Sequence, residues 1–312
     1  MKRIFCLLLV LCLVLSLAAC GKQESNPTEA PEQPAPTELP TEAPVVTETE
    51  APTEAPTEPP VVSFEAVELI NNENLIFAVT EFVTSEHLGL EMKVYCENKA
   101  ERPVIFSLDG VAVCGIMYDP FWAEEVTGGS AIYSTVSFDT FQLEEMGITS
   151  IDEISFHLSV VDSEEWMNEP LADDDFTIYP TGLTAETVVY PEYRHKNGET
   201  IVLDNENLLF IIEKVDDAGD DLFSISCYIA NRTDKDLLLS WDGVSVNSMM
   251  VDPFWAAAVG AGKQLYTTVS FFRSDLEAQG IEDVREIVFT LTGIDYENFD
   301  TILEENLTFQ PK

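Results

Sequence analysis

Residues 207–230 read NLLFIIEKVDDAGDDLFSISCYIA, which is two apolar runs with the acidic segment DDAGDD between them. The runs at residues 207–215 and 222–230 are rich in β-branched and aromatic side chains, which favour β-strands. Aspartate and glycine between two such runs are typical of a turn. This stretch therefore predicts two strands joined by an acidic turn at residues 216–221.

Short apolar runs separated by polar turns continue to the end of the chain. Further strands are predicted at residues 237–241, 244–250, 265–271, 286–294 and 306–309. Asp242-Gly243 is a strong hairpin signal between two of these strands. Residues 274–277, SDLE, have the form of a helix capping box, and Gly280 stands where a left-handed residue ends a helix.

Strands of this length and spacing predict an all-β fold. About seven or eight short strands, separated by turns every ~8–12 residues, indicate an antiparallel β-sandwich of the immunoglobulin-like kind with one short helical turn. The Cys-Trp-Cys arrangement of antibody domains is absent from the sequence, so the strand count alone carries this assignment.

The phrase DPFW occurs twice, at residues 119–122 and 252–255, which is an offset of 252 − 119 = 133 residues. At that offset, without a gap, 35 of the 95 positions from Asn72 to Trp166 are identical to their partners. Solenoid and propeller units repeat every ~20–50 residues, so this longer period predicts that each copy folds around its own core. We expect two tandem sandwich domains, copy 1 at residues 63–180 and copy 2 at residues 200–312, joined by a hinge at residues 181–199.

The N-terminus consists of MKR, an apolar run at residues 4–17, and the ending LAAC at Cys20. This pattern closely resembles the bacterial lipoprotein signal, in which the peptide is cut before the cysteine and the thiol receives a diacylglycerol. The resemblance implies a signal peptide at residues 1–19 and lipid attachment at Cys20, which would hold the chain on the extracytoplasmic face of a bacterial membrane. The alternative is an ordinary signal peptide that contains Cys20 by chance.

Residues 20–62 form a segment rich in Thr, Glu and Pro, in which TEAP occurs four times. Such a composition has too little apolar surface to fold, and proline stiffness and like charge keep it extended. At ~3.1 Å per residue it could reach roughly 130 Å, so we expect a disordered stalk. It looks like the spacers of lipoproteins from Gram-positive bacteria. A proline-rich recognition motif is the alternative.

Charge limits the partners of the folded part. Residues 63–312 carry 12 basic and 48 acidic side chains, a net charge of −36 in a chain of −42. Nucleic acid and anionic lipid surfaces require clustered Lys and Arg, so neither is an expected partner. The acidic clusters at residues 173–175 and 216–221 are expected to be solvated loops, with a calcium ion as the alternative; no other metal and no cofactor is predicted.

Three cysteines remain after the signal peptide and Cys20, namely Cys96, Cys114 and Cys227. None is repeated at the 133-residue offset, which argues against a disulfide framework. We expect them to be small apolar strand residues, and a Cys96–Cys114 bridge stays open as an alternative. At the 133-residue offset, His157 aligns with Thr290 and His87 with Asp220, so neither histidine is repeated. The sequence contains no nucleophile elbow, Cys/His dyad or zinc ligand set, so no enzyme activity is predicted.

The two DPFW phrases are the candidate binding residues. Asp-Pro suits a turn, and Phe with Trp would then cap one end of the sandwich as scaffold. Exposed tryptophans could instead stack on a sugar or a protein partner. The candidate ligand contacts are Asp119, Trp122, Asp252 and Trp255.

Copy 2 contains six short phrases: NRT at residues 231–233, DGVSVN at 242–247, DPFWA at 252–256, Gly262-Lys263, VSF at 269–271 and LEAQGI at 276–281. With these phrases the copies resemble modules of uncharacterised exported proteins and lipoproteins of clostridia-like Firmicutes. Copy 1 departs from the pattern at Cys114 and Ser130. The resemblance covers nearly all of residues 63–312 and implies no activity.

These observations favour a surface lipoprotein whose two sandwich modules bind or adhere to a protein or glycan ligand. Two linked modules gain avidity when both engage at once. The alternative is an accessory subunit that docks on a membrane or cell-wall complex through an apolar sheet face.

Overall fold

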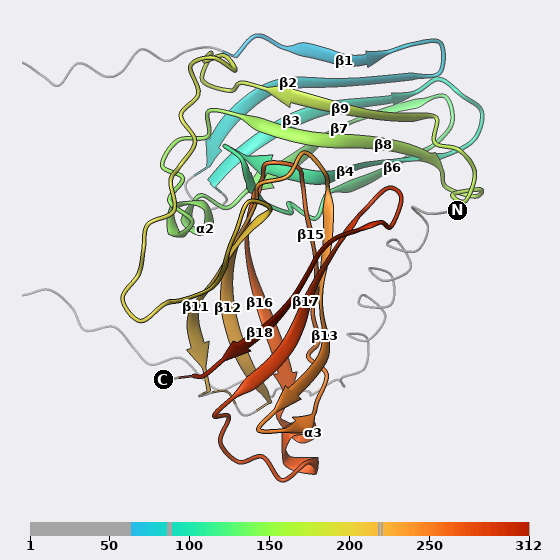
Figure 1. The fold of residues 1–312 in the computed structure, drawn as a ribbon. Helices are drawn as coiled ribbons and strands as arrows, with labels where there is room; N and C mark the ends of the chain where they lie inside the picture. The colour runs from blue at the N-terminus through green and yellow to red at the C-terminus, as the bar shows by residue number, and fades with distance from the viewer. Residues whose placement is uncertain (1–63, 86–88, 218, 220, 312) are drawn as a thin grey trace, which may run out of the picture. The chain divides into compact units, whose positions relative to one another are not determined.

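The apolar runs form antiparallel β-strands because their side chains alternate between a core face and an outer face. In β3 (Gly89–Asn98) the buried residues are Met92, Val94, Cys96 and Asn98, two positions apart. The part of the chain that the structure describes is all-β with two short helices, as the sequence predicts (Figure 1). Val62–Lys312 makes one compact unit.

The computed structural model describes residues 64–85, 89–217, 219 and 221–311. The predicted signal peptide, Cys20 and the whole of the predicted stalk at residues 20–62 lie outside these residues. Within the described ranges, no helix combines the length and the apolar character that crossing a membrane requires.

Nine strands and one helix belong to copy 1. They are β1 (Val67–Asn71), β2 (Leu75–Ser85), β3, β4 (Val104–Val113), β5 (Ile116–Met117), β6 (Ala123–Val126), β7 (Ser130–Phe138), α2 (Thr140–Glu145), β8 (Ile154–Asp162) and β9 (Ala172–Ile178). One sheet has the order β1-β2-β3-β7, and a second runs β5-β4-β8-β9 with β6 beside β4.

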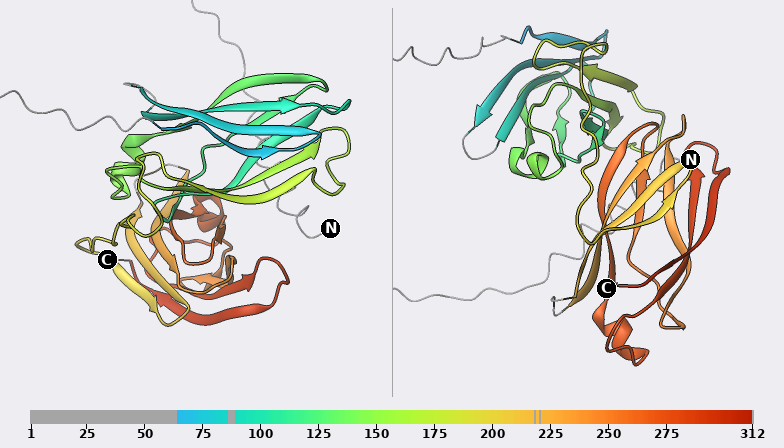
Figure 2. Two further views of the ribbon diagram at one scale, coloured as in Figure 1. Left: turned by 90° about the horizontal axis from the view of Figure 1, so that it is seen from above. Right: turned by 60° about the vertical axis from the view of Figure 1, so that its left-hand side comes forward.

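Copy 2 repeats this order of strands. Its elements are β10 (Thr200–Asp204), β11 (Leu208–Asp216), β12 (Leu222–Asn231), β13 (Leu237–Val246), β14 (Met249–Met250), β15 (Ala256–Val259), β16 (Gln264–Phe272), α3 (Arg273–Ala278), β17 (Ile287–Asp295) and β18 (Thr301–Phe309). The sheets are β10-β11-β12-β16 and β14-β13-β17-β18, with β15 beside β13. Helix α3 lies at one end of these strands (Figure 2). A single parallel residue pair, Gln264 with Ile116, links β16 to β5 and so joins one sheet of each copy into a continuous nine-stranded sheet.

Two hydrophobic clusters fill the space between the paired sheets. The first draws Phe77 and Met92 from one sheet and Phe106 from the other, all without exposed surface. The second joins Phe210 of β11 to Phe289 of β17 in the same way. Each cluster takes its buried residues from one copy, with partly buried Tyr266 of copy 2 also packed against the first.

The hairpin predicted at Asp242-Gly243 is wrong. β13 runs through both residues, and its register against β17 shifts between Asp242 and Ser245. Gly243 has a φ of 59°, which only glycine adopts at little cost, so Asp-Gly forms a β-bulge. The chain reverses four residues later at Asn247-Ser248, whose φ values of 49° and 72° fit the two central residues of a type I′ turn.

The capping box predicted at residues 274–277 is also wrong, although the helix is present. Helix α3 begins two residues earlier than the box requires, so Ser274 lies inside it and Phe272 is the N-cap without a side-chain hydrogen bond. Gly280 has the predicted positive φ, 72°. In copy 1, Asp139 caps α2 by accepting from the backbone N–H of Phe141 at 2.9 Å.

Two buried asparagines close the turns that precede β4 and β13. Asn98 Nδ2 donates to the backbone oxygens of Arg102 and Val126, at 2.7 and 2.9 Å. Asn231 Nδ2 donates to Lys235 and Val259 in the same way, at 2.7 and 3.0 Å. A buried amide that satisfies backbone carbonyls in this way fixes the turn, because each unmade bond would leave a polar group stranded.

The three cysteines of the described chain are free and buried. Burial raises the pKa of Cys96 to about 12, which makes its thiol a poor nucleophile. The Cys96–Cys114 bridge is therefore not formed in this structure, and all three side chains serve as small core residues.

Candidate functional site

The two DPFW turns follow β5 and β14, and in each the adjacent aromatic rings point in opposite directions. Trp122 is 8% exposed and belongs to the first core, whereas Phe121 is 89% exposed. Trp255 is half-buried against the second core, whereas Phe254 is 57% exposed. The phrase therefore presents one phenyl ring to solvent in each copy.

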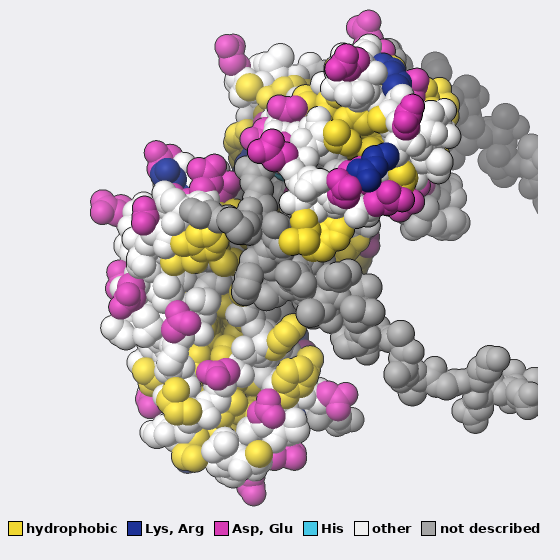
Figure 3. Space-filling view, turned by 90° about the vertical axis from the view of Figure 1, so that its right-hand side faces the viewer, with side chains coloured by type: hydrophobic (Ala, Val, Ile, Leu, Met, Phe, Trp, Pro, Cys, Tyr) yellow, Lys and Arg dark blue, Asp and Glu magenta, His cyan; other side chains and the backbone are white. Residues whose placement is uncertain are grey.

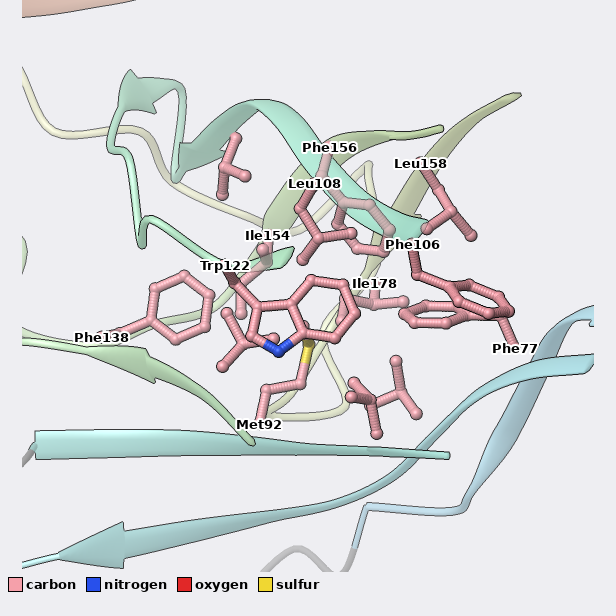
Figure 4. Packing of buried hydrophobic residues seen from close by; sticks show 14 of the residues in the cluster. Phe77, Met92, Phe106, Leu108, Trp122, Phe138, Ile154, Phe156, Leu158 and Ile178 are labelled. Carbon is pink, nitrogen blue, oxygen red and sulfur yellow. The ribbon is translucent and has the colours of Figure 1, made fainter. Parts of the chain in front are cut away.

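The tryptophan anchors each turn to the core. Figure 4 shows the Trp122 indole among Phe77, Phe138 and Met92, and the ring centroids of Trp122 and Phe77 are 6.1 Å apart. Its Nε1 donates to Ser134 Oγ at 3.1 Å. These contacts fix the indole, so the buried Trp122 side chain anchors the turn to the core.

Trp255 repeats this arrangement in copy 2. Its ring stacks on Phe210 at 6.3 Å between centroids, and its Nε1 donates to Thr267 Oγ1 at 3.2 Å. Thr267 stands at the 133-residue offset from Ser134. Both copies thus keep a hydroxyl acceptor for the indole, which satisfies the one polar atom that the ring would otherwise bury.

The phenyl rings are exposed although the backbone around them differs. Phe121 has a φ of 50°, and its N–H donates to Asp119 Oδ1 at 2.8 Å. A bulky residue with positive φ is strained and persists only where its surroundings hold it. Phe254 instead donates its N–H to the backbone oxygen of Ser270 at 2.7 Å, and its ring lies 6.2 Å from Phe272. Exposure of the ring is the property that both copies share.

The structure divides the four predicted contact residues into two groups. Asp119 and Asp252 are exposed beside the phenyl rings, as surface contacts would be. Trp122 and Trp255 face the cores, so their position is that of scaffold. The expectation that Phe and Trp together cap the sandwich is wrong for Phe. Sequence reasoning missed Phe121 and Phe254 because the pattern within a turn does not tell which of two adjacent aromatics points outward.

A histidine lies between two carboxylates on the outer face of copy 1. His157 Nε2 is 2.7 Å from Asp173 Oδ1, and Nδ1 is 2.8 Å from Asp175 Oδ1. Burial lowers the pKa of His157, but the hydrogen bonds and charges of the two aspartates outweigh it and raise the pKa above the ordinary value. Two carboxylates of the acidic run at residues 173–175 thus bind the imidazole.

Within the ranges that the structure describes, no group of three or more His, Cys, Asp and Glu side chains is arranged to hold a metal ion. Acidic side chains are instead spread over the surface with few Lys and Arg among them, as one face shows (Figure 3). This distribution keeps like charges apart and exposes them to water.

Two adjoining shallow depressions of about 480 and 510 Å³ lie on the outer face of the sheet β1-β2-β3-β7. Tyr133 lines both and is 75% exposed. Its ring is 5.0 Å from that of Tyr95, whose hydroxyl donates to Glu97 at 2.8 Å. This face is a second exposed aromatic site, distinct from the DPFW turns.

No protein-family model and no curated protein matches the chain. Among solved structures, the Salmonella enterica SafA pilin in complex with the SafB chaperone is similar at 11% identity and a TM-score of 0.23, over 77% of this chain and 98% of that chain. A protein of unknown function from Porphyromonas gingivalis W83 is similar at 11% identity and a TM-score of 0.19, over 73% and 94%. Likenesses at these scores carry no argument about function.

Proposed function

We propose that the chain is a non-catalytic surface lipoprotein, anchored through Cys20 and resembling those of clostridia-like Firmicutes, that displays two tandem immunoglobulin-like β-sandwich modules on a stalk. The two modules correspond to residues 63–180 and 200–312. The recurrence of one strand order in both copies, and of two separate hydrophobic clusters, supports this assignment.

The observation that carries the binding function is the exposed phenyl ring that each DPFW turn presents. Phe121 and Phe254 occupy the same position in the two copies, beside an exposed Asp119 or Asp252. An aromatic ring on a fixed turn loses little conformational entropy when it binds, which favours its use in recognition. An apolar ring beside a carboxylate suits a protein or glycan ligand with a cationic or hydroxyl group next to an apolar face.

A binding screen with residues 20–312, carrying Cys20→Ala so that no lipid is attached, tests this proposal. The chain is screened against envelope glycans and matrix proteins, and then compared with Phe121→Ala, Phe254→Ala and the double variant. Loss of one ring should weaken binding, and loss of both should remove the avidity of two linked sites. Phe141→Ala is the matched control, because Phe141 is exposed in α2 and has Ser274 as its partner in copy 2.

The alternative function is that of an accessory subunit on a membrane or cell-wall complex. The exposed ring of Tyr133 beside Tyr95 favours it, since docking on a sheet face needs exposed apolar surface. Crosslinking in cells with the lipid-anchored chain as bait separates the two functions. One other protein trapped in near-equal amount would support the accessory subunit, whereas recovery of wall glycan would support the binding module.

A further inference from the structure

The outer face of the first sheet carries the same tyrosine pair in both copies. Tyr95 of β3 lies directly opposite Tyr133 of β7, with the ring centroids 5.0 Å apart. Tyr228 of β12 lies opposite Tyr266 of β16, at 5.1 Å. Side chains directly opposite on one face of a ladder pack against each other, so each pair forms one aromatic surface.

In copy 2 this aromatic surface is covered by residues from outside the copy. The ring of Tyr193 lies on Tyr228 at 4.1 Å between centroids, and Lys196 Nζ is 5.5 Å from the ring centroid of Tyr266. Tyr228 is left 3% exposed. Tyr228 is therefore stabilised by aromatic contact with Tyr193, and the neighbouring Tyr266 by the cation of Lys196.

The type I′ turn of copy 1 at Cys114-Gly115 lies at the edge of the same covered surface. The Gln264 N–H donates to the Gly115 oxygen at 2.9 Å, and Lys263 Nζ donates to Ser155 Oγ at 3.0 Å. Tyr266 also packs against the first hydrophobic cluster. A turn of one copy at the edge of the tyrosine face of the other is therefore a contact that this chain already makes.

Among the residues that the structure describes, none covers the same face of copy 1 in this way. Tyr133 is 75% exposed, whereas Tyr266, the residue at the same position in copy 2, is half-buried. Ala131 stands where Gln264 pairs with the turn. Copy 1 therefore presents an exposed Tyr133 beside a partly buried Tyr95, over two shallow depressions.

Copy 2 offers a turn of the kind that contacts such a face. Its type I′ turn at Asn247-Ser248 corresponds to Cys114-Gly115, and the two methionines that follow it, Met249 and Met250, are 42% and 63% exposed. In copy 1 the residue that corresponds to Met249 is Ile116, which is 1% exposed. Flexible apolar methionines adapt well to an aromatic surface.

We propose that chains associate head to tail, with the Asn247–Met250 turn of one chain at the edge of the Tyr95–Tyr133 face of the next. Each chain carries one free face and one free turn, so the contact is heterologous and does not close on itself as a symmetric dimer does. The inference is independent of ligand binding by Phe121 and Phe254, because it uses other residues.

Charge opposes this association at low salt, since residues 63–312 of each chain carry a net charge of −36. The tyrosine face is itself lined by Glu68, Glu81 and Glu97. Screening weakens repulsion between exposed charges beyond a Debye length, which is about 3 Å at 1 M salt. Association driven by apolar contact should therefore strengthen as salt is added.

Sedimentation velocity of residues 20–312 with Cys20→Ala tests the proposal, from about 1 µM to 1 mM and with increasing NaCl. We expect species larger than a dimer to appear as the concentration rises, and at lower concentration in high salt. Tyr133→Glu and Met250→Glu should each weaken association by about tenfold or more, as expected of central apolar anchors. Phe141→Glu, an exposed aromatic elsewhere in copy 1, should leave it unchanged.

An equal mixture of the two variants distinguishes head-to-tail contact from a symmetric one. Tyr133→Glu keeps an intact turn and Met250→Glu keeps an intact face, so the mixture should form heterodimers and nothing larger. Circular dichroism confirms that each variant is folded. If one is not, Tyr133→Ala replaces Tyr133→Glu, and Met250→Ala replaces Met250→Glu. A chain that stays monomeric throughout in high salt, unchanged association in either folded variant, or a mixture that does not pair would overturn the proposal.

Discussion

Asn98 Nδ2 donates to the backbone oxygen of Val126 at 2.9 Å from a side chain without exposed surface. The bond ties the end of β3 to the end of β6, and Asn231 ties β12 to β15 through Val259 in the same way. The two asparagines are identical at the 133-residue offset, which marks them as part of the framework that both copies need.

Removal of either amide should destabilise its copy. Asn98→Ala and Asn231→Ala leave buried carbonyls without a donor, at about 1–3 kcal/mol for each stranded group. Chemical denaturation measures the change. Asn306→Ala is the matched control, because that side chain accepts from Thr290 at an exposed site and should change stability by less than about 0.5 kcal/mol. Equal effects at the buried and exposed sites would contradict the role given to the amides.

The two aromatics of a DPFW turn should differ in what they contribute to stability. Trp122→Ala and Trp255→Ala should each cost about 3–5 kcal/mol, because a large ring leaves the core. Phe121→Ala should stay within about 0.5 kcal/mol, since its ring is 89% exposed. Thermal and urea unfolding measure both. Unchanged melting of the tryptophan variants would show that the indoles are not structural.

Cys114 and Asn247 hold the same position in the two type I′ turns, and asparagine suits it better. Asn247 Nδ2 donates to the Asp283 oxygen at 2.7 Å, and Oδ1 accepts from the Glu286 N–H at 3.1 Å. Cys114 Sγ makes weaker counterparts of these bonds: it lies 3.6 Å from the Ser150 oxygen, and the backbone N–H groups of Asp152 and Glu153 donate to the sulfur. We expect Asn247→Cys to destabilise by about 1–3 kcal/mol in urea unfolding. The reciprocal Cys114→Asn should raise the urea midpoint, and a lowered midpoint would count against the comparison.

The charge on His157 should make stability depend on pH. Because the folded pKa lies above the unfolded value of about 6.5, the contribution is fully present below pH ~6.5 and is lost as pH rises through the folded pKa. Asp173 and Asp175 bind the ring, and Asp109 lies opposite it on β4.

Because the ion pairs of His157 with Asp173 and Asp175 are partly exposed to solvent, they contribute at most about 1 kcal/mol to the free energy of unfolding. The measurement is the urea stability of the wild-type chain minus that of His157→Gln, at about pH 6 and pH 9. The difference should be larger at the lower pH. A difference that is the same at both values, or larger at pH 9, would show that the imidazolium does not stabilise the fold.

The all-β class was predictable because period-two burial follows directly from apolar alternation, as in β3 and β12. The bulge at Asp242-Gly243 was not, because its form depends on pairing with β17, more than 40 residues further along the chain. Asp-Gly is compatible with a hairpin or a bulge, and only the distant partner decides between them.

The candidate site was predicted in place but not in orientation. Identity of DPFW at the 133-residue offset located the turns, and the exposed Asp119 and Asp252 agree with a surface position. Which aromatic enters the core depends on the hydroxyls of Ser134 and Thr267, which belong to other strands. The buried Asn98 carried a usable signal, since it is an identical residue in a turn that otherwise diverges.

The shared bulge has a consequence for how the chain reaches its native state. β4 and β13 both contain Asp-Gly-Val with a glycine at positive φ, and each shifts register at that point against its partner, β8 or β17. During folding, β4 could therefore pair with β17, or β13 with β8, at little local cost, and such strand exchange is a characteristic error of tandem repeats. Divergence elsewhere, such as Leu108 where copy 2 has Trp241, makes the exchanged cores pack badly. The sequence differences between the copies thus disfavour misfolded states in which strands of one copy pair with strands of the other.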